Sequence, residues 1–84
     1  MDNENTLVFD SEAINEKIIY DTLKEVCENL QERGYNSINQ IVGYILSGDL
    51  GYISSYKGSR KMISKLERSA LVEIMLKKFI LWDV

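Results

Sequence analysis

The segment between residues 71 and 82 constrains the fold of this chain most, because it is apolar on nearly every side. Its only charged residues are Glu73, Lys77 and Lys78. The apolar positions cover almost the whole circumference of the helix that the segment predicts: Leu71, Val72, Ile74, Met75, Leu76, Phe79, Ile80, Leu81 and Trp82. Such a helix has to be buried on more than one side. A chain of 84 residues cannot surround a helix at its own edge.

We therefore expect one face of this helix to pack on the core of its own protomer and another face to form a two-fold dimer interface. The expected interface residues are Leu71, Met75, Leu76, Phe79 and Trp82. The alternative is a monomer in which this helix lies at the centre of the core. A chain this short buries only about 60% of its unfolded surface, so a homodimer would supply the missing burial.

The residue content excludes several classes of site. With one cysteine, Cys27, and no histidine, the chain forms no intramolecular disulfide and fits neither a structural zinc site nor a Ser-His or Cys-His nucleophile pair. Cys27 lies on an apolar stripe, where a cysteine is usually a small core residue. Gly43 and Gly48 are not followed by the Lys-Ser/Thr of a phosphate-binding loop. We predict a protein that is not an enzyme and that needs no cofactor or metal.

Charge is unevenly distributed along the chain. Residues 1–33 hold nine acidic and three basic residues, whereas residues 34–84 hold four acidic and seven basic residues. The total of −3 argues against general affinity for nucleic acid. No basic, apolar signal region and no uncharged run of about 18 apolar residues occurs. We expect a cytoplasmic protein that does not insert into a membrane.

Hydrophobic spacing predicts an all-α fold of about four helices. Residues 1–10 lack a helical period and predict a flexible N-terminal tail, and residues 11–84 predict a helical dimerisation domain. Asp10 or Ser11 caps the first helix and Gly34 ends it. Its inward stripe is Ile14, Ile18, Ile19, Leu23, Val26, Cys27 and Leu30.

The second predicted helix starts at a cap on Asn36 or Ser37 and stops at Gly48. Its expected inward stripe is Ile38, Ile41, Val42, Ile45 and Leu46. Gly43 lies inside it and costs about 1 kcal/mol relative to alanine. Close approach of another helix would explain this glycine, and a hinge is the alternative.

A third helix is expected over residues 60–68 after a cap on Ser59, with a break before a fourth helix capped by Ser69. The second and third helices resemble a helix-turn-helix in outline, and Arg60, Lys61 and Lys65 could contact phosphates or other anions. The turn of about ten residues is long for that motif. A dimeric DNA-binding regulator is therefore the alternative function, and a solvated basic face is the simpler interpretation.

The run from Gly34 to Asp49, Gly-Tyr-Asn-Ser-Ile-Asn-Gln-Ile-Val-Gly-Tyr-Ile-Leu-Ser-Gly-Asp, is followed by Tyr52-Ile53 and by Lys65-Leu-Glu-Arg68. Together these residues resemble the IreB family of small bacterial regulatory phosphoproteins, over roughly residues 6 to 80. The resemblance implies a homodimeric, mostly helical signalling protein. It also implies phosphorylation by a membrane-anchored Ser/Thr kinase with PASTA repeats and reversal by a PP2C-type phosphatase. The implied output is the cell-envelope stress response and cephalosporin resistance, through an unknown downstream effector.

By this resemblance Thr6 is the phosphorylation site, because it precedes Leu7-Val8-Phe9 as the family's threonine precedes a short hydrophobic-Phe element. Phosphate would add about −1.5 to −2 charges to an already acidic segment, which could then dock on the basic residues 57–65. The chain departs from the family in having Asn3 where some members carry a second threonine. It also has Ser37, Leu50 and Ser54 where proline is frequent.

Overall fold

The computed structural model describes the backbone of residues 2–82 and the side chains of residues 15–81. The elements are α1 (Asp2–Glu32), α2 (Ser37–Ser47), the 3-10 turns η1 (Leu50–Tyr52) and η2 (Tyr56–Gly58), α3 (Ser59–Ser64) and α4 (Arg68–Trp82). No strand occurs in residues 2–82, which confirms the predicted all-α class. The predicted tail of residues 1–10, with Thr6, lies outside the residues whose side chains are described, and so does Ile14 of the first predicted helix.

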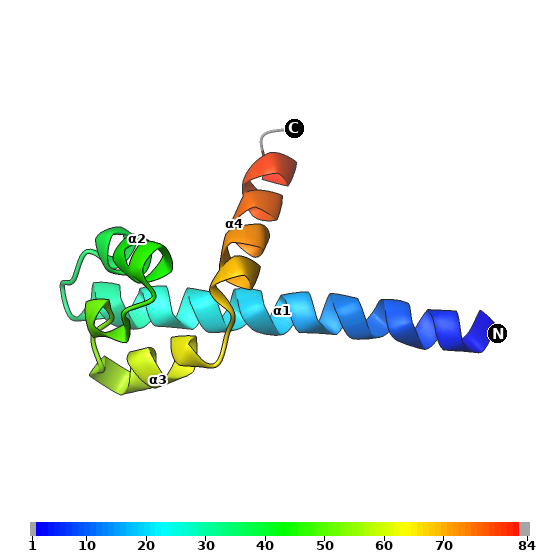
Figure 1. Ribbon diagram of the computed structural model, residues 1–84, viewed down its shortest axis with the longest axis horizontal. Coiled ribbons are helices and arrows are strands. Elements are labelled where there is room, and N and C mark those ends of the chain that lie inside the picture. The colour runs from blue at the N-terminus through cyan, green and yellow to red at the C-terminus, as the bar shows by residue number, and fades with distance from the viewer. Residues whose placement is uncertain (1, 83–84) are drawn as a thin grey trace.

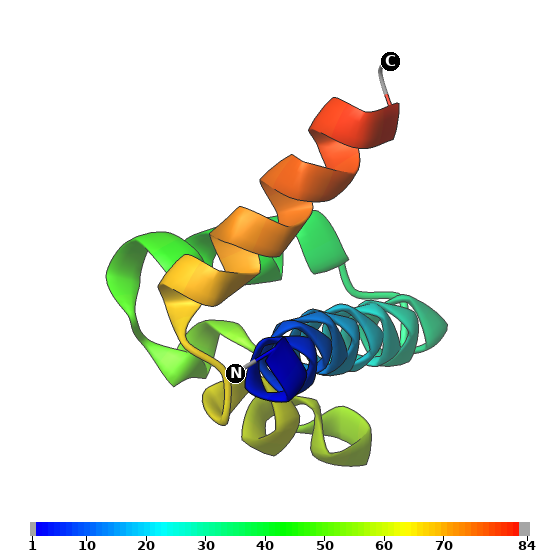
Figure 2. The ribbon, with the colours of Figure 1, turned by 90° about the vertical axis from the view of Figure 1, so that its right-hand side faces the viewer.

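Helix α1 is the axis on which the other elements pack (Figure 1). Its C-terminal half carries α2, the two 3-10 turns and α3, while α4 rises steeply from its middle and projects away (Figures 1 and 2). Four residues of the predicted α1 stripe are buried, at steps of four, three and four: Ile19, Leu23, Val26 and Leu30. Ile18, which was also expected inside, is 53% exposed. The remaining buried apolar residues come from α2, the end of η1, α3 and the start of α4: Ile41, Tyr44, Ile53, Ile63, Leu71 and Ile74.

Gly34 ends α1 as predicted. It adopts φ +85°, a left-handed conformation that glycine tolerates without a Cβ penalty. The Gly34 N–H donates to the carbonyl of Gln31 at 2.9 Å, and the Tyr35 N–H donates to the carbonyl of Leu30 at 2.9 Å. This double closure satisfies carbonyls that the helix end would otherwise leave unpaired, and it turns the chain back toward α2.

Helix α2 begins and ends where the sequence predicts, but it faces the core with a different side. Asn36 is the cap, and its Oδ1 accepts from the Asn39 N–H at 3.0 Å. The buried side is Ser37, Ile41 and Tyr44, with Ile45 half-buried, whereas the predicted inward residues Ile38, Val42 and Leu46 are 73%, 48% and 80% exposed. Ser37 Oγ accepts from Gln31 Nε2 at 3.2 Å, which holds the small residue against α1. The Tyr44 ring then fills the core instead of the aliphatic ridge.

Gly43 is a packing contact, although not with another helix. A Cβ built on it would lie 2.4 Å from Cδ1 of Tyr52, because the tyrosine ring lies directly over the backbone of Gly43. Glycine is therefore required if the ring is to keep this position. The Tyr52 ring thus makes the close contact with Gly43 that the sequence led us to expect from a neighbouring helix.

The break between the last two helices is confirmed, but the third helix ends earlier than expected. Helix α3 ends at Ser64 instead of Arg68, and Lys65–Glu67 form the connection. The Leu66 N–H donates to the carbonyl of Ile63 at 3.1 Å, a tightened last turn that directs Leu66 toward the core. The chain then enters α4, whose Leu71 N–H donates to the carbonyl of Glu67 at 3.1 Å.

Candidate interaction surfaces

One face of α4 is held on α1. Leu71 and Ile74 are buried in the core, and beyond them Lys77 Nζ forms an ion pair with Glu16. The Lys78 ammonium lies 4.6 Å from the centre of the Tyr20 ring, a cation–π distance. These contacts all fall on the side of α4 that faces α1, and they fix the angle at which α4 leaves the body of the protein.

The other faces of α4 are apolar and exposed. Leu76 is 53% exposed, Phe79 64%, Ile80 57% and Leu81 73%. Among the predicted interface residues, Met75, Leu76 and Phe79 are accessible, and Trp82 lies outside the described side chains. Leu71 is the exception, since it is fully buried in its own protomer and a partner cannot reach it. Exposed apolar surface of this size on a small domain is typical of an interaction site.

Helix α2 presents a second apolar surface, which the sequence interpretation placed in the core. Ile38, Val42 and Leu46 follow one another at intervals of four and form a straight ridge, defined here as the α2 ridge. The composition of α2 indicates this second apolar surface. Residues 37–47 contain no charged residue, and apolar residues occupy more of the circumference than one face can hold.

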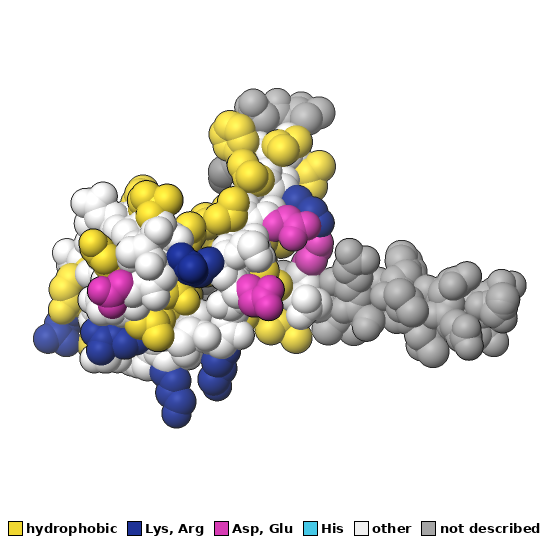
Figure 3. Space-filling view, in the orientation of Figure 1, with side chains coloured by type: hydrophobic (Ala, Val, Ile, Leu, Met, Phe, Trp, Pro, Cys, Tyr) yellow, Lys and Arg dark blue, Asp and Glu magenta, His cyan; other side chains and the backbone are white. Residues whose placement is uncertain are grey.

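The three predicted anion-contacting residues lie in α3 or directly after it, and they are not equivalent. Arg60 Nε donates to the carbonyl of Ile53 at 2.8 Å, so this guanidinium supports the turn between η1 and η2. Lys61 and Lys65 are exposed and form no ion pair with any carboxylate among residues 15–81. Figure 3 shows basic side chains projecting from the side of the molecule where α3 lies.

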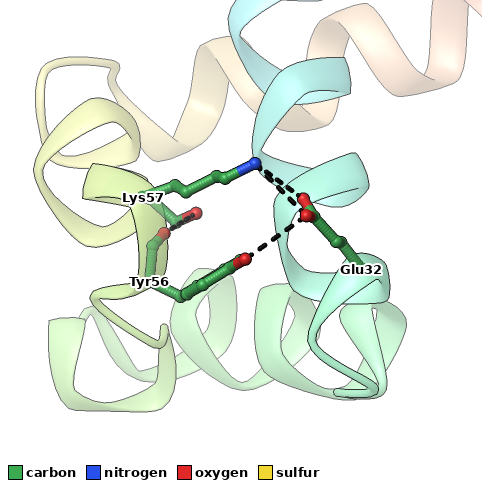
Figure 4. A network of polar contacts seen from close by, with 4 residues as sticks. Glu32, Tyr56 and Lys57 are labelled. Atoms are coloured by element: carbon green, nitrogen blue, oxygen red, sulfur yellow. Dashed lines mark hydrogen bonds and ion pairs between the residues drawn. The ribbon is translucent and has the colours of Figure 1, made fainter.

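Lys57, which the sequence interpretation also gave to the phosphorylated tail, is already paired. Its Nζ lies 3.0 and 3.2 Å from the two carboxylate oxygens of Glu32, and Tyr56 Oη donates to Glu32 Oε2 at 3.3 Å (Figure 4). The Arg33 guanidinium lies 4.9 Å from the centre of the Tyr56 ring. We call Glu32, Tyr56 and Lys57 the clasp, because they join the end of α1 to η2.

The contact between Glu32 and Lys57 shifts the pKa values of both groups. The hydrogen bond from Lys57 is the main cause that lowers the pKa of Glu32, and the same contact raises the pKa of Lys57. Lys57 has φ +52°, a left-handed conformation that costs a non-glycine residue roughly 1–2 kcal/mol. The ion pair helps to hold Lys57 in that conformation, so Lys57 serves the fold more than it serves an external anion.

Residues 15–81 offer no arrangement that resembles a catalytic centre. Within them no group of three His, Cys, Asp or Glu residues is placed to hold a metal ion. The Cys27 thiol is half-buried, and burial, with a smaller contribution from the Glu28 carboxylate, raises its pKa. A raised pKa reduces the thiolate fraction, which is the reactive form.

The regions described above fall within one family match. The model of the family described as IreB regulatory phosphoprotein matches residues 4–81. This chain belongs to the IreB family. The match includes Thr6 as well as both apolar surfaces of α2 and α4. It identifies a regulatory phosphoprotein and does not by itself assign the modified residue.

Two further predictions for this IreB family member concern DNA and the membrane. The chain between α2 and α3 contains two 3-10 turns, and α3 has only six residues. This geometry gives the DNA-binding alternative no support, because a recognition helix needs several side chains along one groove. Within the described part of the chain, every helix is too short or too polar to cross a membrane.

Proposed function

We propose that this chain is a non-enzymatic regulatory phosphoprotein whose phosphoacceptor is Thr6. The observation that carries the proposal is the family match over residues 4–81, which includes this threonine. The proposed modifying enzymes are a PASTA-type Ser/Thr kinase and its PP2C-type phosphatase. The proposed output is control of the cell-envelope stress response and of cephalosporin resistance, through an effector that is still to be identified.

Ser54 and Ser59 of the folded body are less suited than Thr6 as phosphoacceptors, whereas Ser47, Ser55, Ser64 and Ser69 are exposed. Ser59 is fully buried, and its Oγ donates to the carbonyl of Tyr56 at 2.8 Å. Ser54 Oγ accepts from the Tyr56 N–H at 3.1 Å. Thr22, the other threonine of the chain, lies on α1 and is half-buried. Phosphorylation at Ser59 would require part of the body to open first, because a kinase has to enclose the acceptor residue.

The decisive experiment is phosphorylation of the purified protein by its cognate kinase, followed by mapping of the phosphate by mass spectrometry. We expect one phosphate on Thr6, full loss of incorporation in Thr6→Val, and unchanged incorporation in the matched control Thr22→Val. Phosphate found only on Ser54, Ser55 or Ser59 would overturn the assignment. Complementation of a deletion strain with Thr6→Val, followed by a cephalosporin susceptibility test, checks the proposed output.

We also propose that the protein acts as a homodimer and that Lys61 and Lys65 contact the phosphorylated segment. The dimer follows from the uncovered apolar surface of α4, at Leu76 and Phe79 above all. Phe79→Asp should give a monomer in analytical ultracentrifugation, because a carboxylate in an apolar interface is costly to desolvate. A stable Phe79→Asp dimer would place the interface elsewhere. Lys61→Ala/Lys65→Ala tests the phosphate contact: in the complementation assay it should change cephalosporin susceptibility while phosphorylation of Thr6 stays intact.

A further inference from the structure

The α2 ridge and one side of α4 form two apolar stripes that face the same space. On α4 the exposed residues Val72, Leu76, Phe79 and Ile80 follow one another at steps of four, three and one. These steps place them within one arc of the helix, turned away from the side that carries Leu71 and Ile74 toward α1. Phe79 is at the edge of this arc, where it lines a hollow with Tyr20 and Leu23 of α1. We call this set the α4 outer stripe.

Helices α2 and α4 meet where α4 leaves the body. Val72, at the base of the α4 outer stripe, lines a hollow together with Ile45, which lies beside the α2 ridge, and with Glu67, Arg68 and Ser69. Arg68 Nη1 donates to the carbonyl of Ile45 at 2.8 Å and fixes the start of α4 against the end of α2. Hydrophobic side chains are visible both on α2 and along the neighbouring side of α4, with an opening between them (Figure 3). We call this opening the α2–α4 groove.

We propose that the α2–α4 groove receives α4 of a second copy of this chain. In the resulting dimer the two α4 helices lie side by side, and each of them also packs against the α2 ridge of its partner. This inference rests on the homodimer proposed above and specifies its packing. It moves half of the interface onto α2, away from the α4 residues to which the sequence assigned it.

The chemistry of the groove favours an apolar helix as its occupant. Helix α2 carries no charged residue, and neither do residues 79–82 at the end of α4. Glu67 and Arg68 lie at the base of the groove. Along the two stripes beyond this base, a charged peptide would be desolvated without gaining an ion pair. This chain already provides a helix of the required kind, because α4 is apolar on the side that α1 covers and on the side that α1 leaves open.

The exposed area agrees with a dimer of ordinary size. The seven most exposed apolar side chains of the two stripes and the α4 tip are between 48% and 80% accessible: Ile38, Val42, Leu46, Leu76, Phe79, Ile80 and Leu81. Together they present on the order of 800 Å² per copy, which is about what each partner contributes to a stable interface.

Two-fold symmetry covers both stripes at once. In an isologous pair both copies use the same surface. Each copy therefore inserts its α4 into the groove of its partner and receives the partner's α4 in its own groove. A dimer made only by contact between the two α4 helices would leave the α2 ridge in water. A single α4 pair would also cover one side of a helix that is apolar on two.

Charge insertion at the ridge separates this packing from a dimer built on α4 alone. We expect Leu46→Lys and Ile38→Lys to weaken dimerisation at least about tenfold in analytical ultracentrifugation, as hot-spot residues do. Both residues are exposed in the protomer, so helix content measured by circular dichroism should not change. Ser55→Lys, an exposed loop position, is the matched control and should dimerise as the unmodified chain does.

Directed disulfide formation tests the contact itself. In a Cys27→Ala background, one chain carries only Leu46→Cys and the other carries only Leu76→Cys, so any mixed disulfide must join two copies. We expect the mixed disulfide to form under mild oxidation, and we expect none with a chain that carries Lys61→Cys in place of Leu76→Cys.

Three outcomes distinguish the inference from the proposals on which it rests. This packing would be overturned, and the homodimer would stand, if the dimer tolerates Leu46→Lys and if disulfides form only between two chains that both carry Leu76→Cys. A protein that is monomeric at every concentration would overturn the homodimer and this packing together. Phosphorylation at Thr6 is measured separately and decides neither.

Discussion

The C-terminal half of α1 and the outer part of α4 are both rich in apolar residues, yet only the first is covered by its own chain. Around the end of α1, fully buried residues come from separate parts of the chain: Leu30 from α1, Ile53 from the position directly after η1, and Ile63 from α3. Two hydrogen bonds to the backbone of the connecting segment add to this packing: Arg60 Nε donates to the carbonyl of Ile53, and Gln40 Oε1 accepts from the Ser54 N–H. We call this region the closed body, because its apolar residues are covered within the protomer.

The outer part of α4 has the same kind of side chain without the same cover. Past Ile74 its apolar residues are mostly exposed, and the described contacts with α1 are made by Lys77 and Lys78. The difference shows that apolar content indicates how much surface has to be covered, but not which chain covers it. In the body the cover is intramolecular, whereas for α4 and the α2 ridge we propose that it is the partner.

The largest expected effect comes from a pair of truncations, one in each region. Ile53→Ala removes a fully buried side chain and should lower the free energy of unfolding by about 2–5 kcal/mol. Leu46→Ala, at a residue that is 80% exposed, should change it by less than about 0.5 kcal/mol in the monomer. Urea denaturation at a protein concentration below the dimer dissociation constant measures both. Equal losses would show that Leu46 is packed within its own protomer.

The sequence predicts a helix end well where a glycine or a capping side chain decides it locally, whereas the end of α3 at Ser64, which has neither, was placed four residues too late. Gly34 and Gly48 both adopt positive φ, and the Asn36 cap uses its own side chain. The rotation of α2 about its axis is not local, however. Ile41 and Ile45 were assigned correctly to the inside, but the apolar pattern alone does not reveal that Tyr44, and not Leu46, fills the core.

The next effect concerns the contact between Gly43 and the ring of Tyr52, at the edge of the closed body. Gly43→Ala gains about 1 kcal/mol of helix propensity, but the new Cβ overlaps the ring, which has to move. We expect a net loss of roughly 1 kcal/mol in urea denaturation. In a Tyr52→Ala background the same change should be stabilising by about 1 kcal/mol, because only the propensity term is left. The same effect in both backgrounds would contradict the packing role of this glycine.

Contacts between distant segments explain why the sequence gives less of the candidate surfaces than of the fold. The clasp joins Glu32 to Lys57 across 25 positions, and Arg60 reaches the carbonyl of Ile53 from the next helix. Neither contact has a spacing that a helix face would reveal. Lys57 and Arg60 therefore looked like free cations in the sequence, although both support the body. Of the four basic residues expected to meet the phosphorylated tail, Lys61 and Lys65 are the two without such a contact among residues 15–81.

The smallest expected effect is the pH dependence of the clasp. The pKa of Glu32 is lowered from its ordinary value of 4.5, so the carboxylate stabilises the fold above that pH. This contribution is lost as the pH falls through the lowered folded-state value. Because both partners are exposed, the change in Tm should be smaller than that caused by Gly43→Ala.

The variant Glu32→Gln tests this sign directly. It should lower Tm at neutral pH, and the difference from the unmodified chain should shrink as both are acidified, because the unmodified clasp is then lost as well. Glu28→Gln is the matched control, since Glu28 lies one turn earlier on α1, is exposed and forms no ion pair among residues 15–81. A difference between Glu32→Gln and the unmodified chain that persists unchanged into acid would mean that Glu32 acts through packing. The end of α1 would then be held to η2 by the body alone.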